Sequence, residues 1–333
     1  LIYNMTMLIC ALLAIYFNVD VYGFAYVYLI SSIIIVCYYV VVALKKFPLP
    51  DLEIDLDLCK YLVKEAIPFG LSTVFIRIYY YIDTLMISLM ILNPNEVIGW
   101  YNAAYRMVLI LSFIPATFLG SIYPIMSKYY VTSDKYLGFM FERSFKYLMV
   151  LAIPIGVGTT VLADQLTLFV YGPEYEPSTI ALQILIWSEV LIFLSAIFGY
   201  LMNSTNRQVI VTKQTMLAAA LNIVLNFFLI PRYSYVGASA ATVCTELFSF
   251  FFLLYFVSKE GYRLNRYMIS HFFKTLVACL IMVAFIILFS HLHVMLLISI
   301  SATIYFLIIF LLRVMDETDI EIVWQLKDLI KKI

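Results

Sequence analysis

The chain has 333 residues, of which 64% are apolar and only 13% are charged, and its 21 basic residues balance its 21 acidic ones. A soluble domain is about half apolar and about a quarter charged, so this composition excludes a soluble globule and a disordered chain. The lack of net positive charge argues against a nucleic-acid binder. What remains is an integral membrane protein with several spans, and the 17% of aromatic residues fits lipid-facing and interfacial positions.

The apolar residues fall into runs that are long enough to cross a membrane as helices. A spanning helix needs roughly 20 mostly apolar residues. About ten such runs follow one another, at residues 1–17, 21–44, 64–92, 97–127, 142–163, 178–202, 208–230, 236–258, 269–290 and 293–312. They are too long for β-barrel strands and do not alternate apolar with polar residues. We therefore predict an all-α integral membrane protein with about ten transmembrane helices.

Basic residues gather in every second connection between these runs. The connections after 21–44, 97–127, 178–202 and 236–258 are rich in Lys and Arg, as is the C-terminal tail, whereas the others carry mainly acidic residues and one arginine, Arg232. Positively charged loops stay in the cytoplasm. We therefore predict a multi-pass protein of the cell membrane with a cytoplasmic C-terminus.

Two polar stretches lie outside the predicted spans. Residues 45–63 hold two prolines and several acidic residues, without the central Gly and closing Glu of an EF-hand, and are predicted to be a cytoplasmic linker. Residues 316–333 place apolar side chains at helical spacing opposite several lysines, which is typical of an amphipathic helix at the cytoplasmic interface.

Five charged residues fall well inside predicted spans, where each costs a few kcal/mol and usually faces a partner or a water-filled path. They are Arg77, Asp83, Arg106, Glu189 and Glu246. At about 1.5 Å of rise per residue, all but Arg77 lie about 14–16 Å below the outer ends of their spans, near one common level. Arg77 lies about one and a half turns closer to the cytoplasm. We therefore predict that these residues line a substrate or ion pathway.

Neighbouring polar residues suggest how these charges are supported. The spans 64–92 and 97–127 form a hairpin, so Asp83 and Arg106 are expected to pair, in either a structural or a functional role. Tyr80 lies three residues from both Arg77 and Asp83, where it can bridge them, and Asn102 shares a helical face with Arg106.

The remaining polar residues of the spans divide into amides and glutamates. Asn222 and Asn226 lie four residues apart and are predicted either to support the pathway or to join helices by hydrogen bonds. Glu189 and Glu246 have no evident basic partner. A carboxylate in apolar surroundings is costly unless it takes up a proton or a cation, so both are candidates for ion binding.

Metal and redox sites are not indicated. The five cysteines are scattered without a C-x-x-C pair, and His291 and His293 alone rarely form a metal site. No cofactor is predicted beyond a coupling ion, Na⁺ or H⁺.

Five stretches of the sequence, in the same order, resemble the polysaccharide-exporter branch of the multidrug/oligosaccharidyl-lipid/polysaccharide flippase superfamily, the Wzx-type flippases. They are AIPFGLSTVFIRIYYYIDTLMIS (66–88), IGWYNAAYRM (98–107), IPATFLGSIYPIMSK (114–128), VYGPEY (170–175) and LNIVLNFFLIPRYSYVGASAATVCTE (221–246). The last is the most specific, because it combines paired asparagines, a proline, a Gly-Ala step and a glutamate.

The resemblance implies a MATE-like bundle of two six-helix lobes around a central cavity. On that template, residues 1–44 are the last two helices of the first lobe and 45–63 the linker between lobes. Residues 64–258 are the complete second lobe, and 259–333 are two extra transmembrane helices with an amphipathic tail. The chain would then lack about four leading helices, an expectation that agrees with a start at Leu1 in an apolar run.

The resemblance also implies the activity: a transporter, not an enzyme, that flips a lipid-diphosphate-linked oligosaccharide from the cytoplasmic to the outer leaflet for surface glycan assembly. The implied partners are the polyprenyl-diphosphate-linked oligosaccharide, membrane lipids and other polysaccharide assembly proteins. We predict that Arg77 contacts the diphosphate and that Asp83 either holds Arg106 in place or exchanges partners with it. Glu189 or Glu246 would bind the coupling Na⁺ or H⁺.

Three other functions remain as alternatives. A drug/cation antiporter of the sister family would also use intramembrane carboxylates, with less need of arginine. A membrane glycan polymerase or glycosyltransferase usually needs a long polar outer loop, and the outer connections here are short. A purely structural bundle would gain little from five charges at mid-membrane depth.

Overall fold

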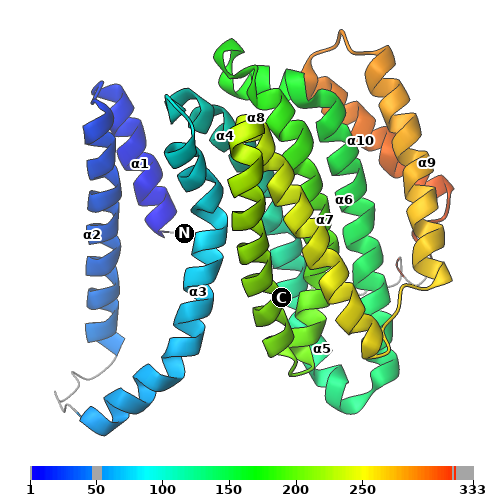
Figure 1. Cartoon of the computed structure of the whole chain (residues 1–333), viewed down its shortest axis with the longest axis horizontal. Coiled ribbons are helices and arrows are strands. Elements are labelled where there is room, and N and C mark those ends of the chain that lie inside the picture. Colours follow the sequence, from blue (N-terminus) through cyan, green and yellow to red (C-terminus); the bar gives the residue numbers. More distant parts are fainter. Residues whose placement is uncertain (1, 47–54, 317–318, 320–333) are drawn as a thin grey trace. The chain divides into compact units, whose positions relative to one another are not determined.

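The computed structural model describes residues 2–46, 55–316 and 319, and this part of the chain is almost entirely helical, without strands (Figure 1). The helices are α1 (Ile2–Tyr16), α2 (Val21–Lys46), α3 (Leu56–Met90), α4 (Pro94–Leu109), η1 (Ile110–Ser112), α5 (Phe113–Thr132), α6 (Asp134–Tyr171), η2 (Pro173–Tyr175), α7 (Ser178–Ser204), α8 (Gln208–Lys259), α9 (Arg266–Leu288) and α10 (Val294–Leu311). Each predicted span coincides with one of these helices or with part of one, except 97–127, which comprises α4, η1 and α5. The predicted all-α membrane fold is therefore confirmed.

Seven helical segments of the described residues are long and apolar enough to cross a membrane. They are Gly23–Lys46, Pro94–Thr132, Asp134–Tyr171, Ser178–Ser204, Gln208–Lys259, Arg266–Leu288 and Val294–Leu311. The 52-residue segment Gln208–Lys259 contains two of the predicted spans. The 38 residues of α6 correspond to about 57 Å of helix, so α6 extends well beyond a hydrocarbon layer of about 30 Å.

The chain divides into two compact units, residues 1–67 and 68–333, with the division inside α3. In the first unit, α1 and α2 pack against each other. Residues 47–54 of the predicted linker lie outside the described residues, and its last part is helical. The carboxylate of Asp55 accepts hydrogen bonds from the backbone N–H groups of Asp57 and Leu58, at 2.9 and 3.0 Å, and so caps the start of α3. The predicted four-part division of the chain stays a prediction.

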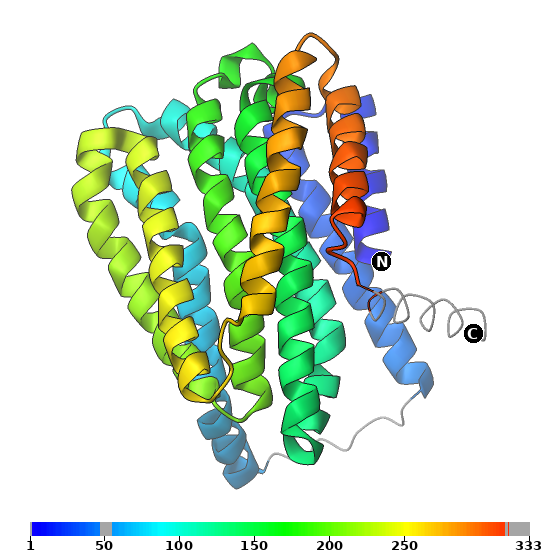
Figure 2. The same ribbon diagram turned by 90° about the vertical axis from the view of Figure 1, so that its right-hand side faces the viewer.

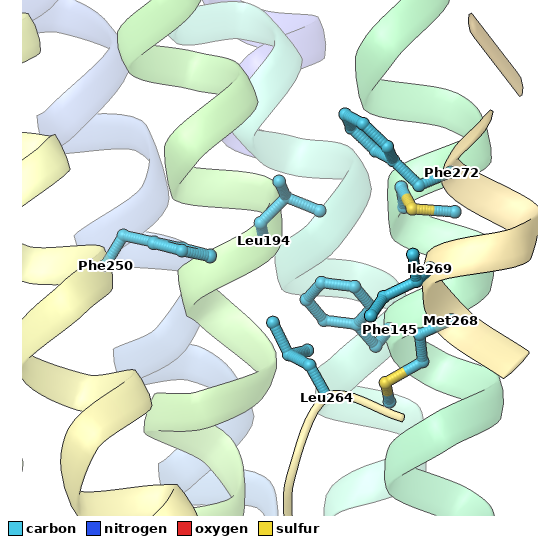
Figure 3. A pocket seen from close by; sticks show the side chains of 8 residues that line it. Phe145, Leu194, Phe250, Leu264, Met268, Ile269 and Phe272 are labelled. Atoms are coloured by element: carbon cyan, nitrogen blue, oxygen red, sulfur yellow. The ribbon is translucent and has the colours of Figure 1, made fainter. Parts of the chain in front are cut away.

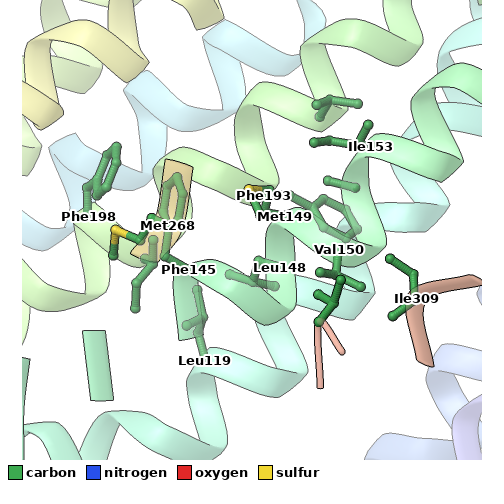
Figure 4. Packing of buried hydrophobic residues seen from close by; sticks show 14 of the residues in the cluster. Leu119, Phe145, Leu148, Met149, Val150, Ile153, Phe193, Phe198, Met268 and Ile309 are labelled. Carbon is green, nitrogen blue, oxygen red and sulfur yellow. The ribbon is translucent and has the colours of Figure 1, made fainter. Parts of the chain in front are cut away.

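The second unit is built around α7, which packs against α4, α5, α6 and α8, while α9 packs against α6 and α10 (Figures 1 and 2). Its core consists of two apolar clusters, of which the larger includes Phe145, Phe193 and Phe198 (Figure 4). A Cβ atom on Gly156 of α6 would lie 2.5 Å from a methyl group of Val190 on α7, so these two helices approach closely only because residue 156 lacks a side chain.

The helix α8 is a hairpin of two antiparallel halves, residues 208–233 and 235–259, which lie side by side in both views (Figures 1 and 2). Ser234 has φ 53° and ψ −138°, which reverses the chain, and Pro231 cannot donate the backbone hydrogen bond that would continue the first half. A Cβ atom on Gly237 would lie 2.4 Å from the carbonyl oxygen of Leu229, so the reversal requires glycine there. The two predicted spans, 208–230 and 236–258, are thus separated where the sequence indicates.

The predicted span 97–127 is interrupted in the middle by a short 3₁₀ segment, η1. Pro115 is the third residue of the second part, α5, and has no N–H to bond with the carbonyl of Leu111, four residues earlier. A tighter 3₁₀ turn accommodates this missing bond. Ser112 lies in this turn, and its side chain is part of the site described next.

Candidate functional site

Asp83 of α3 is buried, with 4% of its surface exposed, and its carboxylate accepts three hydrogen bonds. Tyr101 Oη of α4 and Thr242 Oγ1 of α8 donate to Oδ2 at 2.5 and 2.8 Å, and Asn226 Nδ2 of α8 donates to Oδ1 at 2.5 Å. A buried charge is tolerated only when it is paired or well hydrogen-bonded. The carboxylate of Asp83 is therefore held by neutral donors from two other helices.

The two asparagines of α8 extend this group. Asn226 Nδ2 also donates to Asn222 Oδ1 at 2.9 Å, and both side chains are almost fully buried. Asn226 Oδ1 is buried without a hydrogen-bond partner among the described residues. Such atoms are rare in proteins and call for an explanation such as a water or an ion. The Asp83 site thus has an acceptor oxygen to spare beside a carboxylate.

Glu246, in the second half of α8, is 8% exposed, and its Oε1 accepts a short hydrogen bond from Tyr79 Oη of α3. Glu246 lies one helical turn from Thr242, so one face of α8 presents both residues to α3. Tyr79 and Tyr80 make an edge-to-face ring contact, with ring centroids 6.1 Å apart.

Glu189 of α7 is 2% exposed and is held by the 3₁₀ segment. Ser112 Oγ lies 2.8 Å from one carboxylate oxygen of Glu189 and 2.9 Å from the other, and its hydroxyl can donate to either. The break that Pro115 introduces therefore places a hydroxyl group on a buried carboxylate.

The three carboxylates belong to one electrostatic cluster. Glu189 and Glu246 interact with each other, and Tyr105 of α4 interacts with both of them and with Asp83. Tyr105 stacks on Tyr101, with ring centroids 5.8 Å apart. Asp83, Glu189 and Glu246 are thus all buried in the second unit, on three different helices; that they converge on one pathway stays a prediction.

The two arginines are arranged differently. The predicted Asp83–Arg106 ion pair does not form, and the side chain of Arg106 is exposed. Asp83 lies seven residues before the end of α3 and Arg106 twelve residues after the start of α4, so Arg106 is five residues, or about 7.5 Å, too far from the turn. Tyr101, seven residues after the start of α4, lies level with Asp83 instead.

The predicted supporting residues are only partly where we expected them. Asn102 accepts a hydrogen bond from Thr84 Oγ1 at 3.0 Å, which joins α3 to α4. Tyr80 is 38% exposed and interacts electrostatically with Arg77, which is also exposed, and with both glutamates rather than with Asp83. A place on a transport pathway for these residues and the five charges stays a prediction.

The sequence did not single out three of the hydroxyl donors, nor the stacked Tyr105. Tyr79, Tyr101, Tyr105 and Ser112 look like ordinary residues of a helix wall. A signal was nevertheless present for Tyr101, because residues at equal distances from the turn of an antiparallel hairpin face each other. The same rule applied to the turn at Ser234 places Asn222 and Asn226 opposite Glu246 and Thr242, respectively.

Three cavities of the second unit lie apart from this cluster. An apolar cavity of about 230 Å³ lies between α6, α7, α8 and α9 and is lined by residues such as Phe145, Leu194 and Met268 (Figure 3). A second apolar cavity, of about 390 Å³, is lined mainly by α6 and α10. A polar groove of about 530 Å³ lies between the start of α6 and the 260–265 connection. None of the three is lined by the buried carboxylates.

Comparison with known sequences identifies one family profile and two archaeal membrane proteins that are similar to this chain. A family profile described as "Polysaccharide biosynthesis protein" matches residues 1–130. A probable low-salt glycan biosynthesis flippase, Agl15, of Haloferax volcanii is 25% identical over 165 residues, which are 49% of this chain and 34% of Agl15. The membrane protein MJ1068 of Methanocaldococcus jannaschii is 25% identical over 175 residues, or 52% of this chain and 34% of that protein. The matched stretch thus spans about a third of the length of each curated relative.

Comparison with solved structures gives the same fold. Lipid II flippase MurJ in an inward closed conformation matches 92% of this chain and 65% of its own with a TM-score of 0.76 at 17% identity. A MOP superfamily transporter from Pyrococcus furiosus matches 68% of this chain and 53% of its own, with a TM-score of 0.51 at 14% identity. An outward-facing MATE family transporter matches 66% of this chain and 52% of its own, with a TM-score of 0.51 at 16% identity.

Together these sequence matches confirm the resemblance to polysaccharide-biosynthesis proteins and glycan flippases, and the solved structures share the fold. The relatives whose names state an activity are flippases or transporters rather than enzymes. The chain is a multi-pass membrane protein.

Proposed function

We propose that this chain, a relative of the polysaccharide-biosynthesis flippases, is part of a transporter that flips a lipid-diphosphate-linked oligosaccharide between membrane leaflets. The movement runs from the cytoplasmic to the outer leaflet, and ion uptake drives it. In this arrangement the Lys- and Arg-rich connections and the C-terminus are cytoplasmic.

One observation carries the proposal: three buried carboxylates from α3, α7 and α8 converge in one bundle, each held by neutral groups. Among the described residues, no lysine or arginine forms an ion pair with Asp83, Glu189 or Glu246. Buried carboxylates without a cationic partner are expensive inside a membrane and are rarely kept for packing alone. Groups of this kind suit the reversible uptake of a proton or a cation.

Asp83 is the best-built position for the coupling ion. Its carboxylate, the free Asn226 Oδ1 and the oxygens of Asn222 and Thr242 supply the hard oxygen ligands that a small cation such as Na⁺ prefers. A proton could be the coupling ion instead of Na⁺, because a protonated Asp83 is neutral and can still accept hydrogen bonds from the surrounding donors. Glu189 and Glu246 then form a second set of ionisable groups in the same cluster.

Arg77 is proposed to contact the diphosphate. A diphosphate cannot cross about 30 Å of hydrocarbon without cationic help, and arginine is suited to bidentate phosphate contacts. Arg77 and Arg106 are both exposed rather than tied up in ion pairs, so their guanidinium groups are available to a ligand. Arg77 also lies close enough to Tyr80 to interact with it, and Tyr80 interacts in turn with Glu189 and Glu246, so Arg77 lies near the second set of ionisable groups.

The experiment uses the full-length protein in proteoliposomes that contain a polyprenyl-diphosphate-linked oligosaccharide, with flipping measured as access of the sugar to a membrane-impermeant glycosidase. We expect flipping that depends on a Na⁺ or H⁺ gradient. The rate should be about tenfold or more lower for Arg77→Ala, because this variant loses a charge-assisted hydrogen bond to the diphosphate. Arg232→Ala, which removes an exposed arginine at the reversal of α8, is the matched control and should stay within about twofold of the wild type.

Two results would count against the proposal. Flipping at the wild-type rate by Arg77→Ala would remove Arg77 from the substrate site. Gradient-independent sugar release with a change in the sugar's covalent structure would instead indicate a glycan polymerase or transferase.

The second candidate is a drug/cation antiporter of the sister family. The similarity of the fold to a MATE family transporter favours it, and the three carboxylates would serve it equally well. Exchange of a cationic drug for Na⁺ or H⁺ by the same proteoliposomes, without movement of the lipid-linked sugar, would support that function instead.

A further inference from the structure

A second group of buried charges lies where the segment after α10 meets α6 and α9, and it shares no hydrogen bond with the carboxylate cluster. Lys146 of α6 is fully buried, and Asp319 is 1% exposed. Lys146 Nζ donates to Asp319 Oδ2, and Arg143 Nη1 donates to Asp319 Oδ1 at 2.9 Å. Arg143 also pairs with Asp316. Two cations on adjacent turns of α6 thus meet two carboxylates from the end of the described chain.

The rest of the contact comes from aromatic residues of α6 and α9. Tyr147 donates its hydroxyl to Asp319, and Tyr267 lies within hydrogen-bond distance of both Arg143 and Lys146. The Arg143 guanidinium also lies over the Tyr267 ring, 5.1 Å from its centroid. We call Arg143, Lys146, Tyr147 and Tyr267 the cradle.

The segment after α10 is shaped to enter this cradle. Arg313 has φ 50°, which turns the chain sharply at the end of α10, and Val314 directly after it is fully buried in the apolar core. Asp316 and Asp319 accept hydrogen bonds from each other's backbone N–H groups at 3.1 and 2.9 Å, the reciprocal pattern of a capping box. We call Val314, Asp316 and Asp319 the latch residues.

The contact is cooperative, because its members share partners. If Asp319 leaves, Lys146, Arg143 and Tyr147 all lose a hydrogen bond at once, and Lys146 is left as a buried charge without its main partner. Buried ion pairs contribute little to stability compared with apolar packing, and their best-documented use is to select one arrangement of the chain. A group of this kind has two states, engaged or released, rather than a range of intermediate ones.

We propose that the latch residues and the cradle form an ionic latch that fastens α9 and α10 to α6, so that these helices move as one body with the second unit. The consequence for transport rests on the proposed function. A released latch would let α9 and α10 move separately from α6, and the flipping rate would fall although the buried carboxylates are intact.

Limited proteolysis tests the latch without reference to transport. Trypsin cuts after Arg313, whose side chain is exposed, but the bond leads into the fully buried Val314. In the purified full-length protein, we expect slow cleavage at Arg313, measured by mass spectrometry relative to cleavage at Arg263 in the exposed 260–265 connection. Asp319→Asn, which keeps the shape but removes the charge, should raise the relative rate at Arg313 by about tenfold or more.

The chain supplies a matched control in its exposed ion pair. Arg207 Nη2 and Glu260 Oε2 lie 3.0 Å apart with side chains 49% and 32% exposed, so Glu260→Gln should change cleavage at Arg313 by less than about twofold. If Asp319→Asn does not fold, Tyr147→Phe removes a single donor to Asp319 and should give a rise of about two- to fivefold.

Each outcome decides a separate part of the proposal. If Asp319→Asn and Tyr147→Phe are both cleaved at Arg313 at the same rate as the wild type, the latch proposal is overturned. Faster cleavage with flipping equal to that of Glu260→Gln would keep the latch as an anchor but overturn its role in transport. If the wild type itself flips no lipid-linked sugar, the proposed function fails, and the proteolysis result still decides whether the latch exists.

Discussion

The substitution Asp83→Asn tests the ion site, because it removes one charge and changes the shape of the side chain very little. In the wild type, three donors from α4 and α8 converge on the carboxylate. The asparagine amide can accept hydrogen bonds only through its oxygen, so at least one of the three donors loses its acceptor. The effect on stability and the effect on ion binding are then expected to differ.

The stability effect is a difference between two large contributions. Three charge-assisted hydrogen bonds at about 1.5–3 kcal/mol each amount to roughly 5–9 kcal/mol in the wild type. Desolvation of a fully buried carboxylate opposes them by several kcal/mol, and the asparagine does not carry this penalty. We therefore expect the variant to fold, with a free energy of unfolding within about 2 kcal/mol of the wild type without the coupling ion.

The loss of ion binding in Asp83→Asn is not offset by a lower desolvation penalty. An ion that binds only the folded protein stabilises it by about 2.7 kcal/mol when its concentration is 100 times the dissociation constant. At roughly 2 °C per kcal/mol for a chain of this size, the melting temperature of the wild type should rise by about 5 °C on addition of the coupling ion. In Asp83→Asn this rise in melting temperature should disappear, since the neutral amide neither attracts a cation as a carboxylate does nor takes up a proton.

The assay is the thermal unfolding of the purified full-length protein, followed in Na⁺, in K⁺ and over a range of pH. Asp164→Asn, which alters an exposed acidic residue at the far end of α6, is the control and should keep the full response. An ion-dependent rise in Asp83→Asn equal to that of the control would refute an ion site at Asp83. It would leave Glu189 and Glu246 as the remaining candidates.

Two further predictions concern the backbone breaks. Gly237→Ala should lower the free energy of unfolding by about 2 kcal/mol or more, because the new Cβ would lie 2.4 Å from the carbonyl oxygen of Leu229. The control Gly199→Ala in α7, whose Cβ would have nothing within 4 Å, should raise the free energy of unfolding by about 0.5–1 kcal/mol. Equal melting temperatures of the two variants would contradict the tight reversal of α8. Ser112→Ala removes the hydroxyl that bonds to Glu189, so it should lower the free energy of unfolding by about 1–3 kcal/mol and change the ion or pH dependence of flipping. The control Ser121→Ala, whose hydroxyl bonds to a carbonyl of its own helix, should change neither quantity. An unchanged ion and pH dependence of flipping in Ser112→Ala would separate Glu189 from the transport cycle.

Much of the architecture follows from the sequence alone. The length of the apolar runs determines that the chain forms membrane helices, because backbone groups in lipid must bond within their own segment. Pro231 lies beside the reversal of α8 and Pro115 lies just after the 3₁₀ segment, and each removes a backbone donor there, whereas Pro124 and Pro154 lie inside helices. The rarity of charge in these runs likewise identified Asp83, Glu189 and Glu246 as special positions.

The partners of those charges were decided only by the tertiary structure. The sequence indicated Arg106 as the partner of Asp83, but the start of α4 at Pro94 sets the register of the hairpin and brings Tyr101 level with Asp83 instead. A shift of a few residues at a turn changes which side chains meet, and no local pattern fixes it. Similarly, Lys146 and Asp319 lie 173 positions apart in the chain, and only the packing of α6 against the segment after α10 removes both from water.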